Sequence, residues 1–318
     1  MCIMMVLSNL LWGGENLFNI ESEYSPVYEL LNSLFVFSAN NNYHDFGKSW
    51  VNEVKTKIDD PQFLSNLDEF NSLSYLGYMN VLIWKSPAKS EISGFFEWFQ
   101  NLSPGEIYEI LSPYLCQGLP GELSEFRDNF LYLLRTWHKI YTIEENIQGI
   151  LSEQAKHLHS EKNKYDPIDL IEDLTNGIRI IPTSEINLVV LVPSYHLTPM
   201  NFVSDMNHIV FITYAFDLPS KDDMVPPIRL SRMTRALADD KRLQILKLLS
   251  QKPYTLTELS KAIKISKSNL HYHITLLRIA GMIRDVNDLS VKYDRYELRP
   301  KVFNDLKNML DGYVLSDL

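Results

Sequence analysis

Apolar residues recur every three or four positions through most of the first 177 residues, which is the period of an amphipathic helix. Ser25-Pro26 is typical of a helix start, because a capping residue precedes a proline at the first helical position. Gly177 is placed to end the last helix of this run. The pattern predicts helices at residues 27–40, 44–58, 63–84, 91–102, 105–115, 122–143, 146–159 and 168–177.

The pattern then changes to short stretches of β-branched and aromatic residues. GIRIIPTS (177–184), NLVVLVPS (187–194) and HIVFITYAF (208–216) are bounded by proline, serine and asparagine, as strands are, and 17–21 is a further candidate strand. Strands that follow one another closely favour an antiparallel sheet. The expected fold class is mainly α with small antiparallel β elements, in an α-helical N-terminal domain that ends in a short sheet.

A polar, proline-rich segment, LPSKDDMVPPI at 218–228, is typical of a linker. The chain has 318 residues, which is long enough for two domains. We therefore expect a mostly helical regulatory or dimerisation domain at 1–217, a linker at 218–228 and a second domain at 229–318.

The second domain carries its own order of helix and strand patterns. MTRALADDKRLQILKLLSQ (233–251) is predicted as one helix, with Leu243 on its buried side. Thr255 and Glu258 have capping-box spacing, so the next helix spans 255–264, and a third follows at 267–281. MIRDV and VKYDRYELR then flank a polar turn as the two strands of a wing. This order predicts a C-terminal winged helix-turn-helix, which places one helix in the major groove of double-stranded DNA.

The third helix of this domain has an apolar face and a polar face. Leu270, Ile274 and Leu277 are predicted to be buried, while Thr275 points away from the core. The side chains expected to contact base edges are Ser268, Asn269, His271 and Tyr272. Those expected to contact phosphates, from the helix and the wing, are Ser266, Lys267, His273, Arg278, Lys292 and Arg295. The alternative is a protein-interaction module whose polar helix is merely solvated.

Charge is divided unevenly along the chain. The formal net charge is −10. Residues 228–318 hold 17 Lys and Arg against 10 Asp and Glu, a balance of +7, and residues 1–227 hold 13 against 30, a balance of −17. This division indicates that only the C-terminal end meets a polyanion.

Candidate chemistry for an enzyme or a metal site is sparse. The two cysteines, Cys2 and Cys116, are far apart, so they favour a reducing cytoplasm and provide no zinc-ligand pair. No phosphate-binding, dinucleotide-binding, hydrolase or zinc-protease motif occurs, and Ser194-Tyr195-His196 is interpreted as a loop at a strand end. We therefore expect no enzymatic activity, cofactor or metal. No apolar run is long enough to cross a bilayer, so a cytoplasmic protein with no membrane partner is expected.

The C-terminal motifs resemble those of ArsR-type transcriptional regulators. LADDKRLQILKLL, then TLTELSKAIKISKSNLHYHITLLRIAGMI, then YEL follow the family pattern from roughly residue 230 to 300. His271 stands where the family often has serine, and Ile274 where it often has leucine. The matching positions are Ala236, Leu237, Ala238, Asp239, Arg242, Ile245, Leu246, Ser266, Ser268, His273, Leu277, Ala280, Gly281 and Tyr296. The layout is also similar to a longer subgroup with a large helical N-terminal domain, here beginning SPVYELLNSL.

The resemblance implies a dimeric, sequence-specific DNA-binding regulator. Many relatives sense metals through cysteines on the helix before the recognition helix, but TLTELSKAIK has none, so metal sensing there is not expected. Relatives dimerise through flanking helices, and KVFNDLKNMLDGYVL is either such a helix or a core helix of one subunit. The N-terminal domain would sense an unknown small-molecule effector or mediate assembly. The aromatic residues between 24 and 216 form either a core or an apolar ligand pocket. The alternative function is an N-terminal enzyme or interaction scaffold with a vestigial winged helix.

Overall fold

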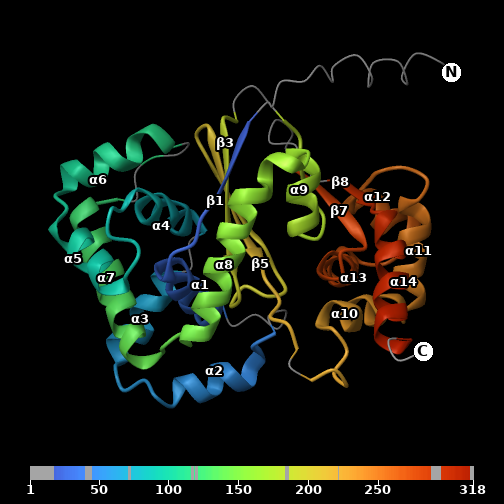
Figure 1. The fold of residues 1–318 in the computed structure, drawn as a ribbon, viewed down its shortest axis with the longest axis horizontal. Coiled ribbons are helices and arrows are strands. Elements are labelled where there is room, and N and C mark those ends of the chain that lie inside the picture. Colours follow the sequence, from blue (N-terminus) through green and yellow to red (C-terminus); the bar gives the residue numbers. More distant parts are fainter. Residues whose placement is uncertain are drawn as a thin grey trace.

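The described strands form two separate sheets, one in the middle of the molecule and one in the winged helix (Figure 1). The computed structural model describes residues 18–39, 45–70, 73–115, 118, 121–182, 186–220, 222–287 and 295–315. Over these residues the chain is mainly helical, as expected, and the two sheets are mixed rather than purely antiparallel.

The central sheet has the strand order β1-β3-β5-β4. It consists of β1 (Asn19–Ser22), β3 (Leu188–Ser194), β5 (Ile209–Ala215) and β4 (Phe202–Met206). The expected antiparallel pairing of β3 with β5 is wrong, because both β1 and β5 run parallel to β3. β4 forms an antiparallel hairpin with β5 on its outer side, so the chain leaving β3 passes beyond β5 before it returns. Both β3 and β5 are almost entirely buried, as parallel strands usually are.

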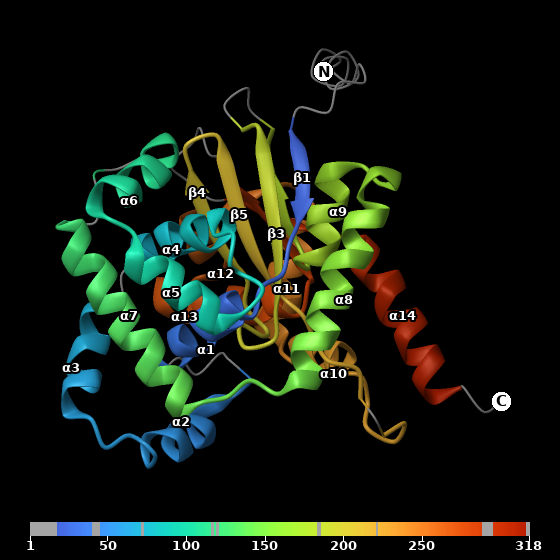
Figure 2. The ribbon, with the colours of Figure 1, turned by 60° about the vertical axis from the view of Figure 1, so that its left-hand side comes forward.

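Helices cover both faces of this sheet (Figure 2). Val190, Val192 and Phe211 face one layer of helices, while Val189, Leu191 and Ile212 face the other. The first layer contains α1 (Pro26–Ala39), α2 (Gly47–Lys55), α3 (Pro61–Phe70), α4 (Leu73–Lys85), α5 (Ile92–Asn101), α6 (Pro104–Leu111) and α7 (Leu123–Ile140). The second contains α8 (Glu145–Glu161) and α9 (Pro167–Leu174).

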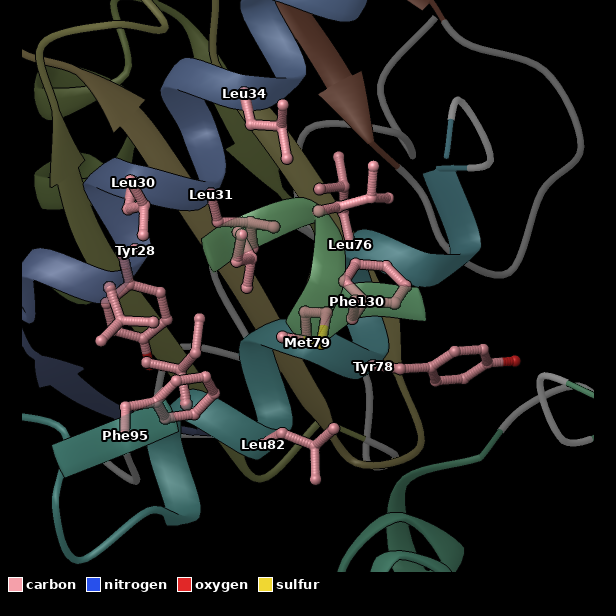
Figure 3. Close-up of a cluster of buried hydrophobic side chains, with 14 of the residues drawn as sticks. Tyr28, Leu30, Leu31, Leu34, Leu76, Tyr78, Met79, Leu82, Phe95 and Phe130 are labelled. Carbon is pink, nitrogen blue, oxygen red and sulfur yellow. The ribbon is translucent and has the colours of Figure 1, made fainter. Parts of the chain in front are cut away.

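The larger layer is held together by a dense apolar and aromatic core. Figure 3 shows Leu30, Leu31 and Leu34 of α1 beside Met79 and Leu82 of α4. All five side chains are fully buried. Phe63, Phe95, Phe99 and Trp137 are fully buried in the same core, so these aromatic residues fill the core rather than line an open pocket.

The C-terminal part has a core of its own and the predicted winged-helix order. Its elements are α10 (Ile228–Leu237), α11 (Asp240–Leu249), β6 (Tyr254–Thr255), α12 (Leu256–Ile263), α13 (Lys267–Ile279), β7 (Ile283–Asn287), β8 (Arg295–Leu298) and α14 (Lys301–Val314). The prediction of a single helix at 233–251 is wrong, because Asp239 accepts a hydrogen bond from the Arg242 amide and so caps a new helix, α11, after the end of α10. Leu243, expected to be buried, is 46% exposed.

One strand joins the two parts of the molecule. β2 (Ile178–Ile180), expected in the N-terminal sheet, pairs instead with β7 in the order β2-β7-β8-β6. The two strands are parallel, with Ile178 opposite Asp285 and Ile180 opposite Asn287. β2 thus extends the sheet of the winged helix with a strand from the N-terminal part.

Candidate nucleic-acid interface

The turn between α12 and α13 is built by local hydrogen bonds. The Thr255 hydroxyl accepts from the Glu258 amide, and the Glu258 carboxylate accepts from the Thr255 amide, which closes a capping box at the start of α12. Lys264 ends α12 in the left-handed conformation, with φ of 59°. The Ser266 hydroxyl then caps α13 by accepting from the Asn269 amide at 3.2 Å. These bonds set the angle at which α13 leaves the turn.

Apolar packing fixes which face of α13 points outward. Leu270, Ile274 and Leu277 are essentially inaccessible to solvent and pack into the winged-helix core. Ser268, Asn269 and His271 are exposed, and Tyr272 is 48% exposed. The four side chains predicted to contact bases therefore lie together on the first half of α13. Thr275 differs from expectation: it is buried, and its hydroxyl donates to the His271 carbonyl one turn earlier.

The residues predicted to contact phosphates differ in their exposure to solvent. Ser266 and Lys267, at the start of α13, and Arg295, at the start of β8, are exposed. His273 is mostly buried, and its Nδ1 lies 3.7 Å from a carboxylate oxygen of Asp239, which indicates a role between helices. Lys292 lies outside the described residues.

Arg278 points toward the N-terminal part. Its guanidinium pairs with Asp285 of β7 at 2.7 Å, and its side chain is 38% exposed. Arg278 also lines a narrow space with Pro199, Met200 and Asn201 of the N-terminal part. The C-terminal end of α13 therefore lies at the junction between the two parts, while its N-terminal half is open to solvent.

Exposed cations lie at the end of α12, at the start of α13 and in the loop before β6. Lys261 and Lys264 end α12, and Lys267 begins α13, and all three are exposed. Lys252, in the loop before β6, lies 4.9 Å from the centre of the Tyr254 ring. Exposed cations next to the polar side chains at the start of α13 suit contacts with a phosphate backbone on either side of the base edges.

Arg242 has a role that the sequence pattern does not reveal. Its guanidinium is buried and donates to the carbonyl oxygens of Ala236 at 2.7 Å and Arg235 at 2.9 Å. These carbonyls end α10, so Arg242 joins α10 to α11. In the sequence, an arginine two residues after a helix start resembles a surface cation. Only its contact with the end of α10 in the structure distinguishes Arg242 from one.

The Ser194-Tyr195-His196 segment is a buried support for the central sheet. The Glu29 carboxylate accepts from the Ser194 hydroxyl at 2.8 Å and from the amides of Tyr195 and His196. Nδ1 of His196 lies 2.6 Å from the same carboxylate. Glu29, Ser194 and His196 are fully buried, and the serine hydroxyl bonds to the carboxylate rather than the imidazole. The segment therefore lacks the geometry and the access that a serine nucleophile requires.

Among the described residues, no group of three or more His, Cys, Asp or Glu side chains is placed to hold a metal ion. In the same part of the chain, no helix combines the length and apolar character needed to cross a bilayer.

Comparison with known proteins adds one match. Residues 239–285 match the family model described as bacterial regulatory protein, arsR family. No curated protein and no solved structure matches the chain. The match begins at the cap of α11 and ends within β7, so it contains α12, the turn and all of α13. Such a domain supports a DNA-binding transcription regulator, and residues 239–285 are an ArsR-family helix-turn-helix.

Proposed function

We propose that the protein is a sequence-specific transcriptional regulator that binds double-stranded DNA as a homodimer. The observation that carries this proposal is the exposed polar half of α13, from Ser268 to Tyr272, within an ArsR-family helix-turn-helix. Helix-turn-helix proteins place the first residues of this helix against base edges.

The exposed side chains form two groups, one suited to contact bases and the other suited to contact phosphates. The Asn269 amide can bond to two atoms of one adenine, and Ser268, His271 and Tyr272 add donors and acceptors beside it. Lys267 and Arg295 are exposed cations at the edges of this surface, where phosphates would lie. The first group supplies sequence preference and the second supplies affinity that depends on salt.

The homodimer is supported by an apolar stripe on α14 that the described residues of the chain leave exposed. Phe303, Leu310 and Val314 are 41%, 43% and 60% exposed. At about 100° per residue they fall on one side of the helix. Val302 is buried against the winged-helix core on another side, with Leu306 and Met309 partly buried. The helix therefore serves its own subunit with one face and offers a second apolar face to a partner copy.

The N-terminal part is proposed to regulate this binding, either by sensing an effector or by mediating assembly. A cleft of about 800 Å³ lies in it at the starting ends of the parallel strands, lined by residues such as Asn19, Asn187 and His208. Asparagine and histidine side chains offer both donors and acceptors, which suits a small polar ligand.

Fluorescence anisotropy with a duplex selected from a randomised library tests the proposal. Asn269→Ala should reduce discrimination at one base position by about 1–3 kcal/mol. Lys267→Ala should weaken all duplexes alike and lower the magnitude of the salt slope by about 1. Lys247→Ala is a matched control, because Lys247 is an exposed cation on α11 rather than α13.

Two results would contradict the proposal. One is a folded wild-type protein that enriches no sequence and shows no saturable binding at low salt. The other is an Asn269→Ala variant that selects the same sequences as the wild type with the same preference at every position.

A further inference from the structure

The winged helix is attached to the N-terminal part by more than the chain that links them. Between α9 and β7 the two parts share backbone hydrogen bonds, a cluster of ion pairs and a close backbone approach. We call α9, β2 and the turn between them the latch segment (residues 167–180). In Figure 1, α9 lies between the central sheet and the winged helix.

Backbone pairing is the first component of the latch. The outer edge of β7 would otherwise present free amide and carbonyl groups, as any sheet edge does. β2 covers this edge in parallel register, and the Asp285 amide donates to the Gly177 carbonyl at 2.8 Å. The pairing spans only three residues on the β2 side, so it forms a short and separable contact.

Glycine at position 177 permits this approach. Its φ is +125°, a conformation that side chains disfavour, and a Cβ there would lie 2.5 Å from the Ile283 carbonyl oxygen. Any larger residue must therefore push β7 away from the turn. The structure thus provides a substitution that acts directly on the latch.

The buried carboxylate of Glu172 is the second component. It accepts from Arg179 of β2 at 2.8 Å, Arg284 of β7 at 2.8 Å and Arg299, just after β8, at 3.1 Å. The adjacent Asp173 accepts from Arg299 and from Lys301 at the start of α14. Two neighbouring acidic residues of α9 thus hold three segments of the winged helix.

The C-terminal end of α13 also contacts the latch segment and its partner strand β7. Arg278, near the end of α13, pairs with Asp285, whose amide is bound by Gly177. A Cβ on Gly281, just after α13, would lie 3.3 Å from the Cβ of Asn176, so the end of the helix abuts the latch turn. The latched arrangement nevertheless leaves the Ser268–Tyr272 half of α13 exposed.

We infer that the latch segment couples the N-terminal part to DNA binding, with the closed form as the binding form. This inference rests on the proposed DNA-binding function. A closed latch holds wing strand β7 and the end of α13 in one orientation, so the free energy of ordering them is not lost when DNA binds. An open latch leaves both free to move and lowers the affinity.

The latch segment also reaches the cleft of the N-terminal part. Asp166 and Pro167, at the start of α9, line that cleft, whereas Glu172 and Asp173 lie at the other end of the same helix. A small polar molecule bound in the cleft would therefore touch the helix that carries the latch carboxylates. A shift of α9 is the route by which it would change DNA affinity.

Two variants of the full chain test the coupling. Gly177→Ala and Glu172→Gln should each speed hydrogen exchange at residues 283–287 and weaken binding to a library-selected duplex by about 5- to 150-fold. Gly149→Ala on α8 is the matched control, because a Cβ there meets nothing within 4 Å. All five tryptophans precede residue 138, so their fluorescence reports independently whether the N-terminal part stays folded.

Each outcome decides a different point. Faster exchange with weaker binding supports the inference, and faster exchange with unchanged affinity overturns the coupling. Unchanged exchange in both variants overturns the latch itself. A wild-type protein that binds no duplex overturns the proposed function, while the exchange measurement still decides whether the latch exists.

Discussion

Glu172 accepts hydrogen bonds from arginines of three segments, although only 5% of its side chain is exposed. Burial alone would raise the pKa of this carboxyl, but the hydrogen bonds from Arg284 and Arg179 outweigh it and hold the pKa below the usual 4.5. Removing one partner of a buried ion cluster is costly because the remaining charges lose their compensation. The Glu172 carboxylate therefore compensates the charges of three arginines in this buried cluster.

Acid should weaken the contribution of Glu172 to stability. Because its folded-state pKa is lowered, this contribution is complete above pH 4.5 and is lost as the pH falls through the folded-state value. At neutral pH we expect Glu172→Gln to unfold with about 3 kcal/mol less free energy than the wild type. The difference should shrink below pH 4.5 in urea titrations followed by circular dichroism. Glu153→Gln, 76% exposed, is the control, and a pH-independent difference would refute this account.

At the scale of elements, α10 and α11 show how two short helices are joined. Asp239 starts α11 through its side chain, and Arg242 returns to the last carbonyls of α10. Both contacts depend on residues three to seven positions apart, yet the break they cause is invisible to hydrophobic periodicity, which runs on through Met233, Leu237 and Ile245.

Arg242→Met should destabilise the winged helix while preserving its apolar packing. The carbonyl oxygens of Ala236 and Arg235 would lose their charged donor, at a cost of about 1–3 kcal/mol. Thermal or urea unfolding measures this loss. Lys247→Met, an exposed change on the same helix, should cost under about 0.5 kcal/mol. Equal effects of the two substitutions would exclude a bridging role for Arg242.

Local pattern predicts the elements well and their partners poorly. A capping box locates α12 and a serine cap locates α13, each together with its apolar spacing, since these signals depend on residues within one or two turns. The partner of a strand is set by distant residues: the three-residue β2 lies only a few residues before β3 in the sequence, yet it pairs with β7, more than a hundred residues later. The near-continuous apolar runs of β3 and β5 do carry a signal for parallel, doubly covered strands.

In the candidate interface too, some features follow from local pattern and others depend on distant residues. The exposure of Ser268, Asn269 and His271 follows from the period of α13. The position of Arg278 at the junction of the two parts cannot be predicted from this period, because its environment is created by β7 and by the loop at 199–201. Glu172 is ordinary in sequence, and only the meeting of α9, β2 and β7 gives it importance.

Across the whole molecule, the uneven charge and the attachment of the winged helix to the N-terminal part both affect how DNA approaches α13. Residues 1–227 carry a balance of −17 and residues 228–318 a balance of +7, so the N-terminal part repels the polyanion that the C-terminal part attracts. The latch segment contacts the C-terminal end of α13, while the exposed Lys264 and Lys267 lie at its N-terminal end. DNA approaching the open half of α13 therefore meets the basic end first.

The apolar stripe of α14 predicts the assembly that would use this arrangement. Two-fold pairing would set two recognition helices against half-sites roughly 34 Å apart, and each subunit would strengthen the binding of the other. The wild type should sediment at twice the chain mass of 37.0 kDa. Leu310→Glu places a charge in the stripe and should give monomers that bind the selected duplex about 100-fold or more weakly.

Asn304→Glu controls for the added charge, because Asn304 is exposed and lies about 100° around α14 from Phe303. It should remain dimeric and keep its affinity. If Leu310→Glu also stays dimeric, the partner surface lies elsewhere. If the wild type is monomeric both free and on DNA, the stripe has another partner and the protein binds a single half-site. Retained dimerisation with lost binding would place Leu310 at the DNA, which its position on α14, outside α13 and the wing, argues against.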